Sequence, residues 1–166
     1  MKSLVLSFAI FTVFQIGYSQ GDSFKKSFED VTLTNSSYLY EVKDQNTPKI
    51  VQGLQLKAAN YDVRELADGQ SYDSEGIKVI HRATNGYIST VYNKMGQVVT
   101  SWERFRDVAP PKSIQKLVAK NFKGWEIVGN KYISMYDKEK VKTKVYKLKL
   151  SKEGRTKRVT IDLLEL

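Results

Sequence analysis

The residues of this chain that could take part in chemistry are few, and most are carboxylates. Five of them fall within one acidic loop at residues 62–75: Asp62, Glu65, Asp68, Asp73 and Glu75. Because paired carboxylates do general acid–base work in many hydrolases, a small hydrolase that uses this loop is one alternative. The spacing of these carboxylates does not match a calcium-binding loop, in which acidic residues alternate and a Glu comes last. Carboxylates on loops are usually only solvated, so no metal site is predicted.

Other kinds of catalysis lack their residues. His81 is the single histidine, and a lone histidine on the inward face of a strand is most often a core residue. The chain has no Cys, which excludes thiol chemistry, thiolate metal ligands and disulfides. It contains no G-x-S-x-G, G-x-x-x-x-G-K or G-x-G-x-x-G motif. The sequence therefore predicts no catalytic residue and no cofactor, and a protein that is not an enzyme.

The first 19 residues have the features of a secretory signal peptide. MKSLVLSFAIFTVFQIGYS has a basic start at Lys2, an apolar run over residues 4–16, and small residues Gly17 and Ser19. The apolar run is shorter than the roughly 20 residues that span a bilayer. We expect cleavage near Ser19 and Gln20, a periplasmic or secreted protein, and no transmembrane segment in the mature chain.

The formal net charge of +9 is concentrated in the second half of the chain. From Lys94 onward there are 18 Lys and Arg against 8 Asp and Glu, a net +10, whereas residues 1–93 hold 9 against 10, a net −1. Such a half attracts anionic partners, although a Lys-rich face can also be merely solvated. Export removes nucleic acid as a target and leaves acidic proteins, peptides, and envelope glycans or lipids.

A short pattern occurs twice, at a shift of 63 residues. The shift aligns Pro48, Lys49, Gln52, Leu54 and Lys57 with Pro111, Lys112, Gln115, Leu117 and Lys120. Each copy reads as a proline-led amphipathic helix followed by strand material that opens with an aromatic residue. Coincidence is the alternative. If the repeat is real, each copy forms one helix packed on one antiparallel meander. The apolar stripe of the helix and the apolar face of the sheet are then both buried against each other.

The turns set the expected pairing of the strands. The segment SYLYEV, at residues 37–42, reads as a short strand. Asn85-Gly86 is a two-residue hairpin signal, and the next turn lies around residues 94–95, which together place Tyr87 opposite Trp102. In the second copy we expect a bulge near Val145 and Tyr146.

Alternation along the strands then selects an outward face with aromatic and basic side chains. The candidate binding residues on that face are Tyr87, Trp102, Tyr132, Tyr136, Lys142, Lys144 and Arg158. Exposed aromatic residues anchor protein partners, and neighbouring cations steer acidic ones. The alternative is that the aromatics pair across strands only to stabilise the sheet.

Three segments carry a family resemblance: TVYNKMGQVVTSWERF, APPKSIQKLVAKNFKGWEIV and KVYKLKLSKEGRTKRVTID. They resemble the exported PepSY-like proteins with a beta-lactamase-inhibitor-like (BLIP-like) fold of Bacteroidetes-type bacteria, with Asn93-Lys94-Met95-Gly96 in place of the family's turn. The match covers residues 86–163 well and 47–85 loosely. The resemblance implies tandem helix-on-sheet units and a binding or inhibitory role, and it carries over no inhibitory contact residue.

These observations predict an α+β fold of two tandem units, each one helix packed on an antiparallel β-meander. The expected divisions are a signal peptide at 1–19, an N-terminal extension at 20–46, a first unit at 47–107 and a second, PepSY-like unit at 108–166. The expected function is an exported, non-catalytic binding or inhibitor-like module with an acidic protein or peptide partner. Electrostatic adhesion to an anionic envelope glycan or lipid is the other alternative, beside the hydrolase.

Overall fold

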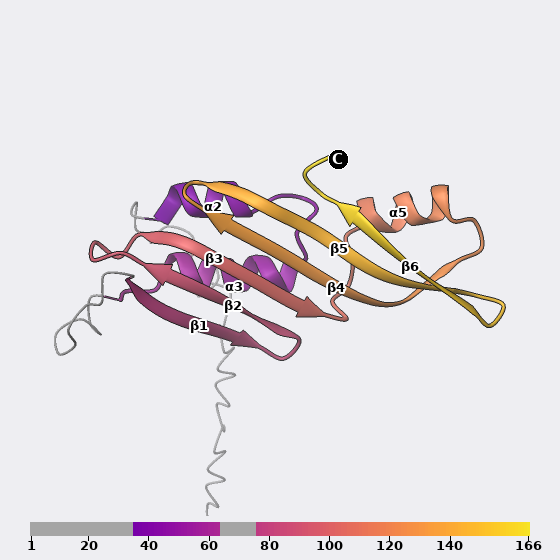
Figure 1. Cartoon of the computed structure of the whole chain (residues 1–166), viewed down its shortest axis with the longest axis horizontal. Coiled ribbons are helices and arrows are strands. Elements are labelled where there is room, and N and C mark those ends of the chain that lie inside the picture. Colours follow the sequence, from indigo (N-terminus) through magenta and orange to yellow (C-terminus); the bar gives the residue numbers. More distant parts are fainter. Residues whose placement is uncertain (1–34, 64–75) are drawn as a thin grey trace, which may run out of the picture. The chain divides into compact units, whose positions relative to one another are not determined.

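The computed structural model describes residues 35–63 and 76–166. The predicted signal peptide, the first part of the N-terminal extension and residues 64–75 of the acidic loop lie outside the described residues. The elements in chain order are α2 (Ser36–Val42), α3 (Lys49–Ala59), β1 (Ile77–Ala83), β2 (Gly86–Tyr92), β3 (Val98–Arg106), α5 (Lys112–Asn121), β4 (Glu126–Asp137), β5 (Lys140–Lys152) and β6 (Arg155–Asp162) (Figure 1).

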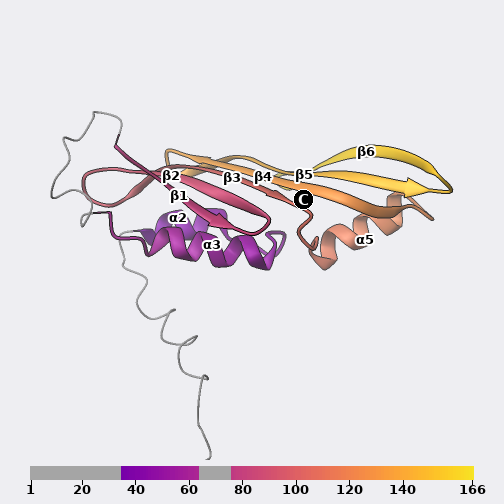
Figure 2. The ribbon, with the colours of Figure 1, turned by 90° about the horizontal axis from the view of Figure 1, so that it is seen from below.

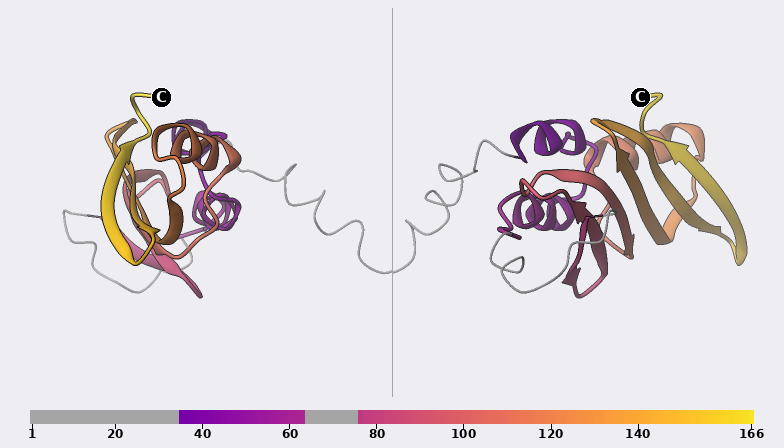
Figure 3. Two further views of the ribbon diagram at one scale, coloured as in Figure 1. Left: turned by 90° about the vertical axis from the view of Figure 1, so that its right-hand side faces the viewer. Right: turned by 60° about the vertical axis from the view of Figure 1, so that its left-hand side comes forward.

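The predicted fold of two tandem helix-on-meander units is wrong. The strands form one six-stranded antiparallel sheet in the order β1-β2-β3-β4-β5-β6, with the usual progressive twist (Figure 3). β3 pairs with β4 from Thr100 opposite Asp137 to Arg106 opposite Lys131, across the boundary expected at residue 108. Two separate meanders would each leave an unpaired edge here, and pairing satisfies the backbone groups of both.

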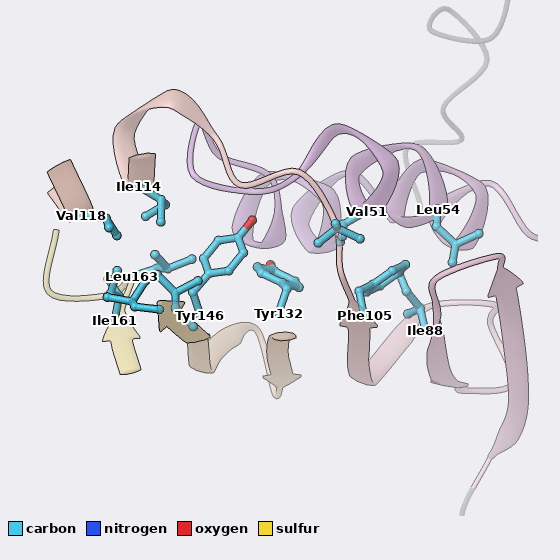
Figure 4. Packing of buried hydrophobic residues seen from close by; sticks show 13 residues of the cluster. Val51, Leu54, Ile88, Phe105, Ile114, Val118, Tyr132, Tyr146, Ile161 and Leu163 are labelled. Atoms are coloured by element: carbon cyan, nitrogen blue, oxygen red, sulfur yellow. The ribbon is translucent and has the colours of Figure 1, made fainter. Parts of the chain in front are cut away.

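The helices α2, α3 and α5 all lie on one side of this sheet (Figure 2). We call the side that they cover the inner face and the opposite side the outer face. Both proline-led helices are confirmed: α3 follows Pro48 and buries Val51, Leu54 and Ala58, and α5 follows Pro111. The core between helices and sheet extends from Leu54 and Ile88 to Val118 and Ile161 (Figure 4).

The strand expected at residues 37–42 is instead the helix α2. Its tyrosine and valine residues are typical of a strand, but Tyr38 and Val42, four residues apart, lie on one helical face and are both buried. The Tyr38 ring packs edge-on against Tyr136 of β4, with 5.1 Å between ring centroids. Tertiary packing has therefore overridden the local pattern.

The first hairpin is shifted from the expected register. Ala83 pairs with Gly86, so the two-residue loop is Thr84-Asn85. Gly86 lies within β2, and this position requires glycine because a Cβ there would clash with the backbone of Arg104 and Phe105 in β3. Between β2 and β3 the chain forms a longer turn, closed by the Asn93 N–H donating to the Gln97 carbonyl at 2.9 Å.

Two bulges invert the expected faces of Tyr132 and Tyr136 on β4 and of Lys144 on β5, whereas Lys142 lies on the outer face as expected. Val128 is an extra residue between the paired positions Ile127 and Gly129, and Lys142 is an extra residue on β5. A bulge changes the phase of the alternation, so every later side chain moves to the other face. The expected bulge near Val145 and Tyr146 is therefore wrong in position. On β6, Val159 and Ile161 point inward and pack against the core.

Candidate functional site

The outer face carries an apolar strip with cations beside it. Adjacent strands place Ile80, Ser89, Trp102, Met135 and Thr143 in one row across the sheet. The next row contains Arg82, Tyr87, Arg104, Ile133 and Val145. Trp102 is 42% exposed and Ile80 is 46% exposed, so solvent reaches the largest apolar groups of this strip.

Four of the seven predicted site residues lie where an external partner can contact them. Trp102, Lys142 and Arg158 are exposed, and Tyr87 is half-buried on the outer face. Tyr87 does not lie opposite Trp102 as expected, since it pairs with Arg104 while Trp102 pairs with Ser89. The two aromatic residues are diagonal neighbours on the same face.

The other three predicted site residues are buried on the inner face, which corrects the prediction. Tyr132, Tyr136 and Lys144 are 0%, 2% and 1% exposed. The bulges at Val128 and Lys142 are the reason, because they bring these side chains under the helices. None of the three can contact a partner on the outer face.

The sequence prediction missed a group of buried polar residues, which we call the buried polar cluster: Tyr38, Gln55, Ser101, Glu103, Ser134 and Lys144. Glu103 of β3 lies opposite Ser134 of β4, which lies opposite Lys144 of β5. The signal was present in the sequence. With Trp102 and Arg104 outward, alternation places Glu103 inward.

Gln55 and Lys144 connect this cluster to the helices. The Gln55 Nε2 atom donates to both carboxyl oxygens of Glu103 at 3.0 Å. The Lys144 Nζ atom donates to the Val42 carbonyl and to Asp44 Oδ2, both at 2.7 Å. These contacts hold the end of α2 and one face of α3 on the sheet.

Burial raises the pKa of Glu103 to about 7. The hydrogen bond from Gln55, the charge of Lys144 and the Tyr38 hydroxyl favour the carboxylate, and Asp44 opposes it. The hydroxyls of Tyr38, Ser101 and Ser134 lie close to these groups but make no hydrogen bond of ordinary geometry to a described residue. Polar atoms buried in this way are commonly served by ordered water.

Glutamate, serine and lysine side chains can do acid–base chemistry, but their placement here does not suit a substrate. Glu103 and Ser134 are 0% exposed, so a substrate cannot reach them in this conformation. The role that the contacts of the buried polar cluster support is structural, because the hydrogen bonds of Gln55 and Lys144 connect α3 and the end of α2 to the sheet.

His81 lies on the inner face, as predicted, and is buried. Its Nε2 atom lies 3.0 Å from the Tyr92 hydroxyl, which itself donates to the Ala58 carbonyl at 2.7 Å. The Thr90 hydroxyl lies 3.1 Å from the same Nε2 atom and donates to the Val79 carbonyl at 3.3 Å. Since both hydroxyls donate elsewhere, their oxygens are left to accept from an Nε2–H tautomer. Burial and the charge of Lys57 lower the pKa of His81, so the ring is neutral near pH 7 and links α3 to the sheet.

Comparison with protein families, curated proteins and solved structures gave no match to this chain in any of the three searches. Within residues 35–63 and 76–166, no helix combines the length and apolar character needed to cross a membrane. The same ranges contain no group of three or more His, Asp or Glu side chains placed to hold a metal ion.

Proposed function

We propose that this chain is an exported, non-catalytic binding module, inhibitor-like in kind, that presents the outer face of its sheet to an acidic protein or peptide. The resemblance to PepSY-like proteins with a BLIP-like fold is part of this proposal. One observation carries it. The described helices all cover the inner face, and the outer face exposes Trp102 and Ile80 beside Arg82 and Arg104 (Figure 2).

Exposed apolar residues with cations around them are typical of a protein-binding surface. Tryptophan and arginine dominate the energy of interfaces, and an apolar centre with a polar rim is the usual arrangement. The cations supply charge complementarity to an acidic partner and speed its association. A partner with acidic side chains around an apolar contact fits this arrangement.

Replacing Trp102 by alanine is expected to weaken partner binding by about 30-fold, which corresponds to an interface anchor worth about 2 kcal/mol. Tyr40→Ala is the matched control, since Tyr40 is an aromatic residue 84% exposed on α2 and lies away from the outer face. The partner is first isolated from envelope extract on the immobilised protein, and the two affinities are then measured by calorimetry. Equal affinity of Trp102→Ala and the parent would reject this face as the binding surface.

A further inference from the structure

Five cations gather at one end of the outer face, across four neighbouring strands. They are Arg106 of β3, Lys131 of β4, Lys147 and Lys149 of β5, and Arg158 of β6. With Asp107, Gly129 and Thr160 they line an open pocket of about 460 Å³. We call this the basic pocket. Its volume lies within the range of ligand sites.

The register places these like charges directly opposite one another. Arg106 pairs with Lys131, Lys131 pairs with Lys147, and Lys149 pairs with Arg158. Neighbouring strands are only about 4.8 Å apart, and like charges at directly opposite positions destabilise a sheet. The fold therefore bears an electrostatic cost at this place, and an anion bound here would relieve it.

No described residue forms an ion pair with any of the five cations. The one carboxylate in the lining, Asp107, accepts a hydrogen bond from the Asn130 backbone N–H at 3.1 Å. Asp107 also has a positive φ of 48°, a conformation that the turn after β3 requires. Its carboxylate is thus used to hold the turn, and the lining keeps an excess of four positive charges.

Gly129 keeps the wall of the pocket free of a side chain. It follows the bulge at Val128, and its Cβ direction points to the same side as Lys149. A Cβ built there would lie 3.5 Å from Asp107 Oδ1 and 3.9 Å from Lys149 Cβ, which is ordinary contact. A larger side chain at this position would extend into the basic pocket without changing its charge.

We propose that the basic pocket binds a ligand that bears phosphomonoester or pyrophosphate groups. To neutralise four excess positive charges with carboxylates, a ligand would need four of them in a space of about 460 Å³. Two phosphate groups supply the same negative charge in less space, because each carries about −1.5 to −2. The two arginines add planar donors that bind phosphate with two hydrogen bonds. This ligand site shares no residue with the Trp102 strip, and ligand binding here does not require a protein partner.

The test titrates inorganic pyrophosphate into the parent protein by calorimetry. We expect saturable binding that is at least tenfold weaker in Lys147→Gln/Arg158→Gln, because this double variant removes two charged hydrogen-bond donors from the basic pocket. Lys116→Gln/Lys120→Gln on α5 is the matched control and should bind like the parent. No binding by the parent, or equal losses in both double variants, would overturn the proposal.

A second variant separates the pocket from its charge. Gly129→Leu retains every cation and should lose pyrophosphate binding by steric exclusion, with thermal unfolding as the check that it folds. Unchanged binding by folded Gly129→Leu would contradict the pocket, and citrate bound as tightly as pyrophosphate would contradict phosphate as the ligand group.

Vesicles distinguish the source of the phosphate. Phosphatidylcholine vesicles with phosphatidic acid present a phosphomonoester at a surface. Binding to them that pyrophosphate displaces would support a lipid headgroup, whereas binding of pyrophosphate alone would support a free phosphate ligand. Neither result bears on whether Trp102→Ala weakens the binding of a protein partner. The basic pocket and the outer-face binding surface can therefore be rejected independently.

Discussion

Replacing Tyr132 by alanine is expected to lower the free energy of unfolding by about 4 kcal/mol, whereas Trp102→Ala should change it by less than about 1 kcal/mol. Tyr132 is 0% exposed, and its ring packs against Phe105 and Tyr146 with centroid distances of 6.5 and 5.4 Å (Figure 4). Removing it leaves a cavity in the middle of the core. Denaturant unfolding of the two variants measures the difference.

Tyr132→Phe isolates the ring from its hydroxyl. The hydroxyl lies near Thr47 and Ser134 but makes no hydrogen bond of ordinary geometry to a described residue. Since an unpaired buried hydroxyl costs free energy, Tyr132→Phe should be neutral or stabilising by up to about 1 kcal/mol. If Tyr132→Ala instead unfolds like the parent, the bulge at Val128 is wrong and Tyr132 faces outward, as the sequence alone predicted.

Replacing Glu103 by glutamine is expected to remove a large part of the pH dependence of stability. The folded-state pKa of Glu103, about 7, lies above its value in the unfolded chain, about 4.5. Between these two values the folded protein binds the additional proton, so this group's contribution to stability is full below about pH 4.5 and falls as the pH rises to about 7. The loss amounts to about 3 kcal/mol, because one pKa unit corresponds to about 1.4 kcal/mol.

The measurement compares the free energy of unfolding of the parent and Glu103→Gln from pH 4.5 to pH 8. The parent should lose about 3 kcal/mol more than the variant over this range, since other groups titrate in both proteins. The glutamine can still accept the hydrogen bond from Gln55. Parallel curves, or a parent that gains stability with pH relative to the variant, would show that Lys144 and Gln55 hold Glu103 ionised and that burial does not dominate.

The two proline-led helices, and the faces of the side chains in the first hairpin, were within reach of sequence reasoning. Pro48 and Pro111 fix the starts of α3 and α5, because proline is well tolerated in the first turn of a helix and its apolar neighbours then recur on one face. Alternation also predicts His81 on the inner face, where the structure places it. The hairpin register was wrong by two residues, which leaves each side chain on its predicted face.

The middle parts of β4 and β5 were out of reach because the phase of their side chains depends on two bulges. KVKTKVYKLKL alternates lysine with apolar or small residues, and a phase change at Lys142 or at Tyr146 fits these letters equally well. The expectation that lysine faces solvent favoured the wrong choice, whereas the fold buries Lys144 with the Val42 carbonyl and Asp44 as its partners. These partners come from about 100 residues earlier, a pairing that no local pattern contains.

The continuity of the sheet was also hidden from the sequence. Two repeats with a connector at Val108, Ala109 and Pro110 are equally compatible with separate sheets or a shared one. The choice is made by the pairing of β3 with β4, which joins edges from the two halves. Trp102 and Arg104 on one half thereby come to share one face with Met135 and Ile133 on the other.

The most direct test of the outer face as a binding surface is site-specific photocrosslinking in the cells that make the protein. A p-benzoylphenylalanine is placed at position 102 on the outer face or, as the control, at the exposed position 116 on α5. We predict one discrete crosslinked protein from position 102 and none from position 116. Crosslinking from position 116 alone, or from neither position, would contradict the outer face as the site where this chain binds its partner.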